Sequence, residues 1–186
     1  METQTDGSLM KQVQSGEISQ LAVLFERYHL PLFRYLLHLS RNRTLSEDLV
    51  QEVFFRVLKY AASYDLSLPF QVWLYRMARN SYFDAIHKHR LEVAGSEVDQ
   101  IRSSEPMPEE LLTRREDTLF LQEALERLPE DKREILVLSR FQNLRYEDIA
   151  SILKCEIGTV KVRVYRALKE LREKFCELRG ERLYDI

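Results

Sequence analysis

Glycine and proline are scarce in this sequence, with five of each among 186 residues. These residues are the strongest local signals of turns, so their scarcity disfavours a fold of short strands joined by tight turns. The hydrophobic share is 45% and the charged share is 31%, which is ordinary for a folded chain and argues against general disorder. We therefore expect an all-α protein, built as one domain or as two small ones.

Cysteine and long apolar runs are also few. Cys155 and Cys176 form neither a paired framework nor the spacing of a metal site, and they fit a reducing compartment. No apolar stretch approaches the ~18 residues of a membrane span, and the first residues lack the apolar core of a signal peptide. We therefore expect a cytoplasmic protein without membrane insertion, and we expect no metal and no cofactor.

The net charge is small, at −2, which by itself argues weakly against a nucleic-acid partner. The charges are unevenly distributed, however. Residues 92–117 carry eight acids and three bases, whereas residues 157–182 carry eight bases and four acids. An acidic middle segment therefore precedes a basic C-terminal segment, and the basic segment is the part of the chain suited to nucleic acid.

Three long amphipathic segments fill the first half of the chain. They run from about Ile18 to Leu39, Leu45 to Ala62 and Pro69 to His89, with apolar residues three and four apart. Pro31 interrupts the first segment, because proline lacks the amide donor that a helix interior uses. Ser46 is the predicted N-cap of the second segment. The periodicity therefore predicts three helices in this half.

Helical periodicity fails between about Leu91 and Pro108, where the chain is acidic and holds glycine, serine and proline. This composition is typical of a flexible linker. Periodicity returns at about Leu111, breaks at Pro129 and continues in three further helices. We therefore expect two small helical domains, residues 1–91 and 112–186, joined by a flexible acidic linker at residues 92–111.

The strongest local pattern is YEDIASILKCEIGTVKVRVYRALKEL, from Tyr146 to Leu171. A short amphipathic helix precedes a three-residue turn, Lys154 to Glu156, and a longer basic helix follows. This order is the helix-turn-helix pattern. The inward positions of the two helices are apolar: Ile149, Ala150, Leu153, Val160, Val164, Ala167, Leu168 and Leu171.

The outward side of the second helix carries cations that can neutralise phosphates or pair with guanine edges. Its residues are Lys161, Val162, Tyr165, Arg166 and Lys169, with Arg163 at the flank. Thr159 lies near the start of this helix, where backbone amides and the helix dipole can bind a phosphate. An amphipathic hairpin with a solvated basic face has the same spacing, so the pattern alone indicates a DNA-binding candidate and no promoter.

Longer stretches of the chain resemble a known family. LERLPEDKREILVLSRFQNLRYEDIASILKCEIGTVKVRVYRALKELR resembles region 4 of the extracytoplasmic-function (ECF) sigma factors of RNA polymerase. SEDLVQEVFFRVLKY resembles region 2.2 of the same family, and FQVWLYRMARNSYFDAIHKHR resembles regions 2.3 and 2.4. The matches occur in the family's order and cover nearly the whole chain. The resemblance implies a specificity subunit, not an enzyme, that binds core RNA polymerase, recognises both promoter elements and helps open the DNA.

The resemblance also implies roles for particular residues. Region 4 would read the upstream, minus-thirty-five element through Thr159 and the outward side of the helix that follows it. In region 2.2, one polar helix side would bind the clamp helices of the largest polymerase subunit, and the polymerase flap is a further contact. The residues of that side are Asp48, Gln51, Glu52 and Phe55. An exposed phenylalanine beside carboxylates suits an interface anchor.

The opened, minus-ten element would contact the helix that starts near Pro69. Cations beside aromatic rings suit unpaired bases, through phosphate contacts and stacking. The contact residues would be Arg76, Arg79, Asn80, Asp84, His87 and Lys88. The loop from Ser63 to Leu68 stands where the family captures a flipped base. Promoter DNA would therefore bind both as a duplex and as a single strand.

Some residues admit a simpler interpretation, and some depart from the family pattern. Phe55 could fold inward, and Trp73 and Tyr75 could be plain core residues. Lys154 stands where the family usually has glycine, and a positive φ there would need strain or a shifted turn. Glu156 replaces a small residue or proline, and His87 and His89 stand where arginines are frequent. The family usually has an anti-sigma factor as a further partner.

Two other classes of function remain open from the sequence. A stand-alone helix-turn-helix regulator would bind its operator without polymerase, so DNA binding by the chain alone discriminates it. An enzyme would need a reactive or metal site, yet His87 and His89 lie two apart on a predicted helix and point in different directions. No glycine-rich phosphate loop or Ser-His-Asp arrangement occurs in the sequence.

Overall fold

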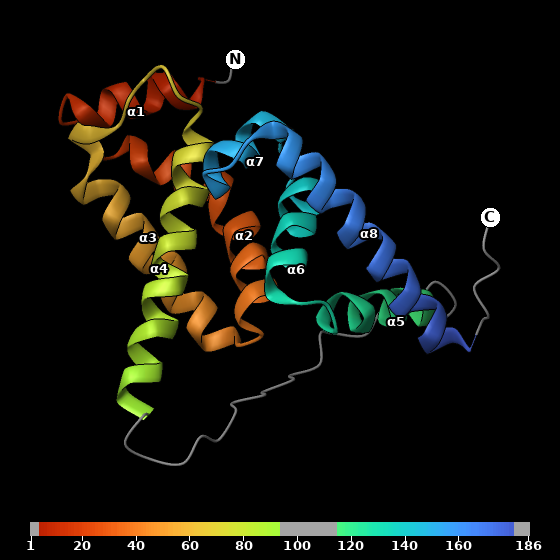
Figure 1. The fold of residues 1–186 in the computed structure, drawn as a ribbon. Coiled ribbons are helices and arrows are strands. Elements are labelled where there is room, and N and C mark those ends of the chain that lie inside the picture. The colour runs from red at the N-terminus through yellow and green to blue at the C-terminus, as the bar shows by residue number, and fades with distance from the viewer. Residues whose placement is uncertain (1–3, 94–114, 181–186) are drawn as a thin grey trace. The chain divides into compact units, whose positions relative to one another are not determined.

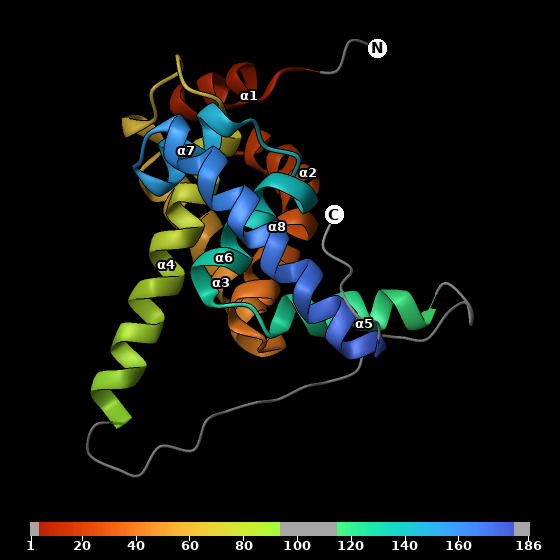
Figure 2. The same ribbon diagram turned by 45° about the vertical axis from the view of Figure 1, so that its right-hand side comes forward.

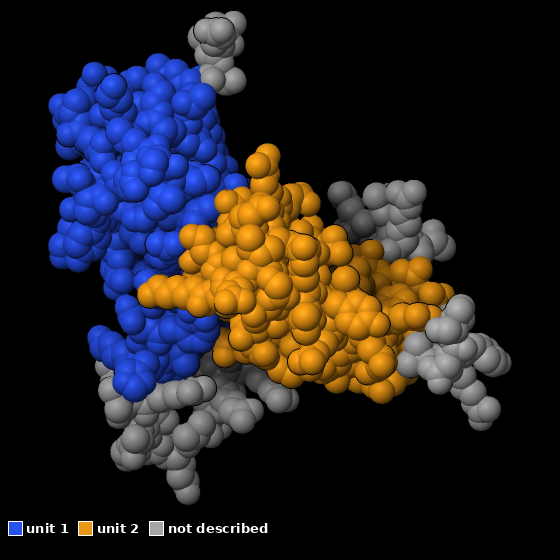
Figure 3. Space-filling view, turned by 45° about the horizontal axis from the view of Figure 1, so that its top comes forward, with its two compact units in different colours: residues 1–104 blue, residues 105–186 orange. Residues whose placement is uncertain are grey.

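The computed structural model describes the backbone of residues 4–93 and 115–180. Every regular element within these ranges is a helix, as the sequence predicts, and they contain no strand. The chain divides into two compact units, residues 1–104 and residues 105–186 (Figure 3). Most of the predicted linker at residues 92–111 lies outside the described residues, so its flexibility and the domain limits stay predictions.

Unit 1 is a bundle of three long helices with a short helix at one end (Figure 1). Its elements are α1 (Asp6–Gln14), α2 (Gln20–Ser40), α3 (Arg43–Lys59), the 3-10 helix η1 (Ala61–Ser63) and α4 (Phe70–Val93). Helices α2, α3 and α4 pack on one another. The apolar stripes that the sequence predicts for these helices form the core, and each large side chain buried there contributes roughly 1.5–3 kcal/mol.

Periodicity alone does not predict α1. Only three of its residues, Leu9, Met10 and Val13, are buried. Thr5 caps the helix, because its hydroxyl oxygen accepts a hydrogen bond from the Ser8 amide at 3.3 Å. Nine residues are too few for an apolar pattern to stand out, and packing against α2 supplies most of the stability of such a short helix.

The predicted N-cap of α3 is wrong. Asn42 is the capping residue, and its side-chain oxygen accepts a hydrogen bond from the Leu45 amide at 3.0 Å. Ser46 lies inside the helix and is fully buried. Its hydroxyl donates to the Asn42 carbonyl at 2.7 Å, which satisfies a polar group that burial would otherwise leave unpaired.

Pro31 does not interrupt α2, which runs continuously from Gln20 to Ser40. A proline inside a helix costs about 3 kcal/mol, through the lost amide donor and crowding of the preceding turn. Leu24 precedes it, and Leu32 and Leu36 follow it, and all three side chains are completely buried. Packing on both sides of the proline therefore outweighs its cost.

Unit 2 is built around its last helix. Its elements are α5 (Arg115–Glu126), α6 (Glu130–Leu136), the π-helix η2 (Val137–Phe141), α7 (Tyr146–Leu153) and α8 (Ile157–Arg179). Helix α8 packs against α5, α6 and α7 (Figures 1 and 2). The break after α5 and the turn before α8 lie where the sequence predicts them.

Ion pairs connect α8 to the two helices that precede the helix-turn-helix. Lys132 of α6 contacts Glu170, and the Arg179 guanidinium lies 3.5 Å from the Asp117 carboxylate of α5. The first pair is partly buried and the second is more exposed. Surface pairs contribute about 1 kcal/mol or less each, so they align α8 more than they stabilise it. The predicted start of α5 at Leu111 lies outside the described residues.

Lys154 ends α7 in the left-handed conformation, with φ 52° and ψ 49°. Its amide donates to the Ala150 carbonyl, which closes the last turn of the helix. The turn is therefore not shifted, and lysine occupies a conformation that costs a residue with a Cβ atom roughly 1–2 kcal/mol. Lys154, where the family usually has glycine, is therefore a residue with a strained backbone.

We expect Lys154→Gly to raise the free energy of unfolding by about 1 kcal/mol, because glycine adopts a positive φ without steric cost. Arg163→Gly is the matched control, since Arg163 is exposed within α8 and glycine should lower stability there by about 1 kcal/mol. Urea denaturation followed by far-ultraviolet circular dichroism measures both. An unchanged or reduced stability of Lys154→Gly would contradict the strain.

Candidate nucleic-acid interface

Helices α7 and α8 form a helix-turn-helix whose turn spans residues 154–156. Val160, Val164 and Ala167 are buried against the rest of unit 2, and Leu168 and Leu171 are half-buried. The predicted inward side of α8 is therefore confirmed. Burial of this stripe fixes the rotation of α8 about its axis, so the opposite side must face solvent.

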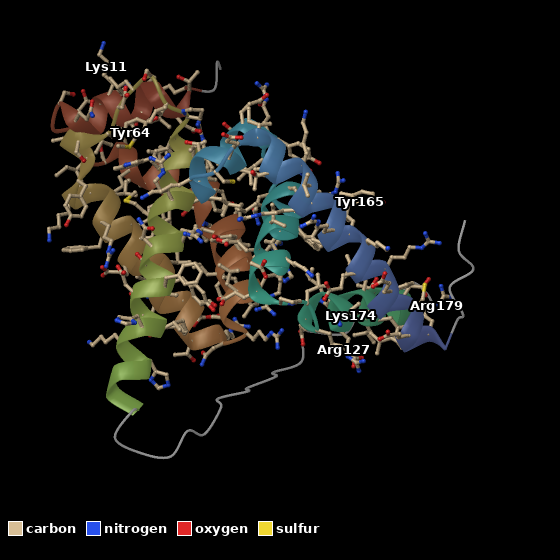
Figure 4. All side chains as sticks on the ribbon, in the orientation of Figure 1. Lys11, Tyr64, Arg127, Tyr165, Lys174 and Arg179 are labelled. Atoms are coloured by element: carbon tan, nitrogen blue, oxygen red, sulfur yellow. The ribbon has the colours of Figure 1, made fainter. Side chains whose placement is uncertain are left out.

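The solvent side of α8 is basic and also carries apolar surface. All six residues predicted on it are exposed: Lys161, Val162, Arg163, Tyr165, Arg166 and Lys169. Tyr165 is 71% exposed and extends away from the helix (Figure 4). Val162 is 48% exposed. The Tyr165 ring and the two methyl groups of Val162 can contact bases, and the cations around them can contact both bases and phosphates.

The cations of this side have no ion-pair partner among the described residues. Lys161, Arg163, Arg166 and Lys169 form no ion pair with any carboxylate in the part of the chain that the structure describes. Farther along α8 the pattern changes, because Lys174 and Arg179, labelled in Figure 4, are paired with carboxylates. Among the described residues, the cations of α8 without an ion pair therefore run from Lys161 to Arg172.

The start of α8 leaves backbone donors available. Glu156 is the N-cap residue, with an extended backbone at φ −76° and ψ 151°, but its side chain makes no capping hydrogen bond. The first amides of a helix have no partner within the helix, and they form an anion site together with the helix dipole. Thr159 lies half-buried in this first turn. A phosphate is the ligand that this end fits.

A second surface lies on α3 and has the opposite charge. Asp48, Gln51, Glu52 and Phe55 are exposed together on the side away from the apolar stripe. Phe55 is 62% exposed, so the interpretation that folds it inward is wrong. Its neighbour Phe54 is the buried ring, and it packs edge-on against Phe25 with ring centroids 4.9 Å apart. We call these four exposed residues the α3 face.

Helix α4 presents the residues predicted to contact single-stranded DNA. Asn80, Asp84, His87 and Lys88 are exposed, and Arg76 and Arg79 are half-buried. The Arg79 guanidinium lies 4.7 Å from the centroid of the Phe83 ring, so cation and ring are presented as a pair. The side chains that are three or four apart share one side of the helix, as expected.

The aromatic residues around α4 divide into core and edge. Tyr75 is completely buried, as the simpler interpretation has it, and Tyr82 is buried with its hydroxyl donating to the Leu39 carbonyl at 3.2 Å. Trp73 is only half-buried, and its ring lies 4.9 Å from that of Tyr64. Tyr60 is 47% exposed. Tyr64, the first residue of the loop that follows η1, is buried, whereas Trp73 and Tyr60 lie at the edge of the core.

A pocket of about 390 Å³ opens at this loop. Residues from α1, α2, the loop and the start of α4 line it, among them Asp6, Tyr28, Tyr64 and Phe70. Burial, followed by the hydrogen bond to Asp6, raises the pKa of Tyr28, and burial raises the pKa of Tyr64. Both phenols therefore stay protonated at neutral pH.

Known families match both units. Residues 24–92 match sigma-70 region 2, and residues 121–171 match sigma-70 region 4. The ECF RNA polymerase sigma factor SigW of Bacillus subtilis strain 168 is 30% identical over 179 residues, which are 91% of this chain and 96% of that relative.

This chain belongs to the ECF sigma factors.

Other relatives and solved structures agree with this assignment. The ECF RNA polymerase sigma-E factor of Escherichia coli K12 is 28% identical over 180 residues, which are 91% of this sigma factor and 94% of the relative. The sigma factor RpoE of Bartonella quintana, solved with the anti-sigma factor NepR, has a TM-score of 0.69 and 27% identity over 82% of this chain and 94% of that one. CnrH, solved with the cytosolic domain of CnrY, shares the fold at a TM-score of 0.68 and 22% identity, over 90% of this chain and 95% of that one.

The matched regions contain all the site residues that the sequence predicts. The exposed side of α8 lies within the region 4 match, and the α3 face and α4 lie within the region 2 match. Arg56 was not among the predicted residues of this sigma factor, although its guanidinium lies 2.7 Å from the Glu52 carboxylate and 3.4 Å from that of Asp84. The spacing of Glu52 and Arg56, four apart on a helix, was a visible signal for the first pair.

Arg56 therefore joins the α3 face to the exposed side of α4. Its hydrogen bond to Glu52 is the largest cause that raises the pKa of its guanidinium, and the bond to Asp84 adds to it. The pocket at the loop was missed as well, since Asp6 contributes to it from α1, which lies outside both family matches. No signal in the local sequence connects Asp6 to that loop.

Two further observations concern this sigma factor's described residues. None of its described helices is both long and apolar enough to cross a membrane. The same residues bring together no group of three or more histidine, cysteine or acidic side chains that could hold a metal ion.

Proposed function

We propose that this sigma factor binds core RNA polymerase with unit 1, recognises the two promoter elements with unit 1 and unit 2, and helps open the DNA. The observation that supports this division is the presence of two exposed faces of opposite character on separate units. The α3 face is acidic and carries an exposed phenylalanine, whereas the exposed side of α8 is basic and without ion pairs among the described residues.

The polymerase contact is assigned to the α3 face. Asp48 and Glu52 provide negative charge for a basic protein surface, and the exposed Phe55 ring, next along the same side of the helix, provides an apolar anchor. Clamp helices of the largest polymerase subunit are the proposed partner. The polymerase flap is assigned to unit 2, where Leu121, Leu171 and Phe175 line an apolar groove of about 420 Å³ between α5 and α8.

The upstream, minus-thirty-five element is assigned to the exposed side of α8. The backbone amides of the first turn bind a phosphate beside Thr159, and this contact sets the register of the helix in the major groove. Lys161, Tyr165 and Arg166 follow on the outward side and reach base edges. Arg166 pairs bidentately with a guanine, while Arg163, at the flank, binds phosphate.

The opened, minus-ten element is assigned to α4 and to the loop of residues 63–68. Asn80 and Asp84 are exposed one helical turn apart and are the proposed base contacts. Arg76, Arg79 and Lys88 are the proposed phosphate contacts. Binding energy for unpaired bases lowers the cost of melting, so opening needs no nucleotide hydrolysis by this chain. The chain is accordingly a specificity subunit and not an enzyme.

The remaining assignments concern organisation and partners. We assign the domain limits to residues 1–91 and 112–186, with a flexible acidic linker between them, and the place of action to the cytoplasm. An anti-sigma factor is a proposed partner, supported by the structural similarity to RpoE of Bartonella quintana in its complex with NepR. A regulator that binds DNA without polymerase would need the α8 surface but has no use for the α3 face.

Run-off transcription with core polymerase and genomic DNA fragments tests the proposed function. We expect defined start sites when the chain is added to core and none with core alone. The same fragments, tested with the chain alone, should show no specific complex. Sequence-specific binding by the chain alone, without any start site in the presence of core, would favour the regulator instead.

Charge reversal at Asp48 and Glu52 should weaken binding to core polymerase by about tenfold or more. The reversed side chains are positive and would repel the basic polymerase surface that the α3 face is proposed to bind. Fluorescence titration of labelled chain with core measures the affinity. The matched control reverses two exposed acids outside the α3 face, Glu17 and Glu26, and so makes the same change in net charge. Equal loss in the two double variants would remove the α3 face from the interface.

Arg166→Ala should cost roughly 1–3 kcal/mol at one base position and relax specificity there, because a bidentate contact to guanine is lost. Arg163→Ala should weaken all sequences about equally and lower the salt dependence, since only a phosphate contact is lost. Binding of holoenzyme to a library of upstream elements at fixed salt compares the two variants. A uniform loss for Arg166→Ala would identify it as a phosphate contact.

A further inference from the structure

Helix α1 holds the loop that follows η1. The Gln14 side-chain amide donates two hydrogen bonds, to the Ala61 carbonyl at 2.9 Å and to the Tyr64 carbonyl at 2.8 Å. These carbonyls lie at the first residue of η1 and just beyond its last one. The ribbon views agree that α1 lies beside this loop (Figures 1 and 2), and Figure 4 places Tyr64 next to α1.

Gln14 is suited to positioning the loop because both donors of its side-chain amide are used. Both of its amide hydrogens are donated to main-chain oxygens nearly 50 residues away in the sequence, so the side chain cannot rotate without losing a bond. The glutamine is half-buried, where a lost hydrogen bond is costly. Helix α1 therefore fixes the main chain at Tyr64, a residue of the pocket wall. Neither family match includes this helix.

Helix α1 also contributes the acidic wall of the pocket. The Asp6 carboxylate accepts a hydrogen bond from Arg27 at 2.7 Å and another from the Tyr28 hydroxyl. The Tyr64 hydroxyl donates to the Leu68 carbonyl. Both phenolic protons are thus committed within the protein, and the oxygens of Asp6, Tyr28 and Tyr64 keep lone pairs that can only accept.

Phe70 adds a third aromatic ring to the pocket, beside the aliphatic and polar residues of the loop. The Phe70 ring lies 5.4 Å from that of Tyr28 and 6.0 Å from that of Tyr64, centroid to centroid. Aromatic ring faces beside the acceptor oxygens of Asp6, Tyr28 and Tyr64 suit a planar ring that carries hydrogen-bond donors. The volume of about 390 Å³ lies within the range of roughly 300–1,000 Å³ for small-molecule pockets.

We propose that α1 completes a pocket for one unpaired base, with Gln14 as the positioning residue of the loop and Asp6 as an acceptor that favours a base with an exocyclic amino group. Adenine, cytosine and guanine each carry such a group, whereas thymine offers only carbonyl oxygens flanking its single N–H. Thymine would place these oxygens against the acceptors of Asp6 and Tyr28. The inference rests on the proposed function, because it assumes that the loop captures a base of the opened strand.

The experiment uses holoenzyme and the single non-template strand of a promoter mapped by run-off transcription. An abasic site replaces each nucleotide of the opened segment in turn, and each position is also changed to thymine. For the wild-type chain we expect one position at which an abasic site weakens binding about tenfold and thymine weakens it comparably. This position identifies the captured base.

Gln14→Ala should abolish the abasic effect at that position and leave the effects at the other positions unchanged. Gln14→Glu is a second variant of the same length, whose carboxylate cannot donate to the two carbonyls. Gln12→Ala, on the same helix, is the matched control and should keep the wild-type profile. Core affinity and helicity, measured for each variant, should equal those of the wild type.

Asp6→Asn should relax the discrimination against thymine, because the amide provides donors for its carbonyl oxygens. Unchanged profiles for Gln14→Ala, Gln14→Glu and Asp6→Asn would overturn the role of α1 while leaving base capture intact. A wild-type profile without any sensitive position would overturn base capture by the loop as well. The two failures are therefore distinguishable.

Discussion

The burial of apolar helix stripes is the constraint on which both binding faces depend. In unit 2, Val160 and Val164 are buried against the neighbouring helices, so the basic side of α8 points away from them and is exposed. In unit 1, Leu49, Val53 and Val57 are buried in the same way, and the α3 face is exposed as a result. A helix has one rotation that buries its stripe, and that rotation selects the residues available to partners.

Ion pairing distinguishes the cations that align helices within a unit from the cations that have no carboxylate partner among the described residues. Lys132 and Arg179 are held by carboxylates of their own unit, whereas Lys161 and Arg166 form no ion pair among the described residues. Arg56 is intermediate, because it is paired on both sides and connects the proposed polymerase contact with the proposed base contacts. If polymerase binds Glu52, the change reaches Asp84 of α4 through the Arg56 side chain, which pairs with both carboxylates.

Long amphipathic elements were predictable from the sequence, and contacts between distant segments were not. The limits of α7 and α8 follow from apolar spacing and from the turn between them, and their exposed side was predicted correctly. The cap at Asn42 was missed because Ser46 has an equally suitable side chain, and burial decides between them. The pairing of Arg56 with a residue 28 positions away, and the reach of Gln14 to the loop, arise only when the chain is folded.

The central claim is that the two units recognise two promoter elements only as part of one polymerase complex. Hydroxyl-radical footprinting on a mapped promoter tests this claim most directly, with the full chain added in the presence and absence of core polymerase. We predict protection of both the upstream and the downstream element with core, and protection of neither by the chain alone. Protection of the same promoter by the chain without core, or protection of one element only in the complex, would contradict the account.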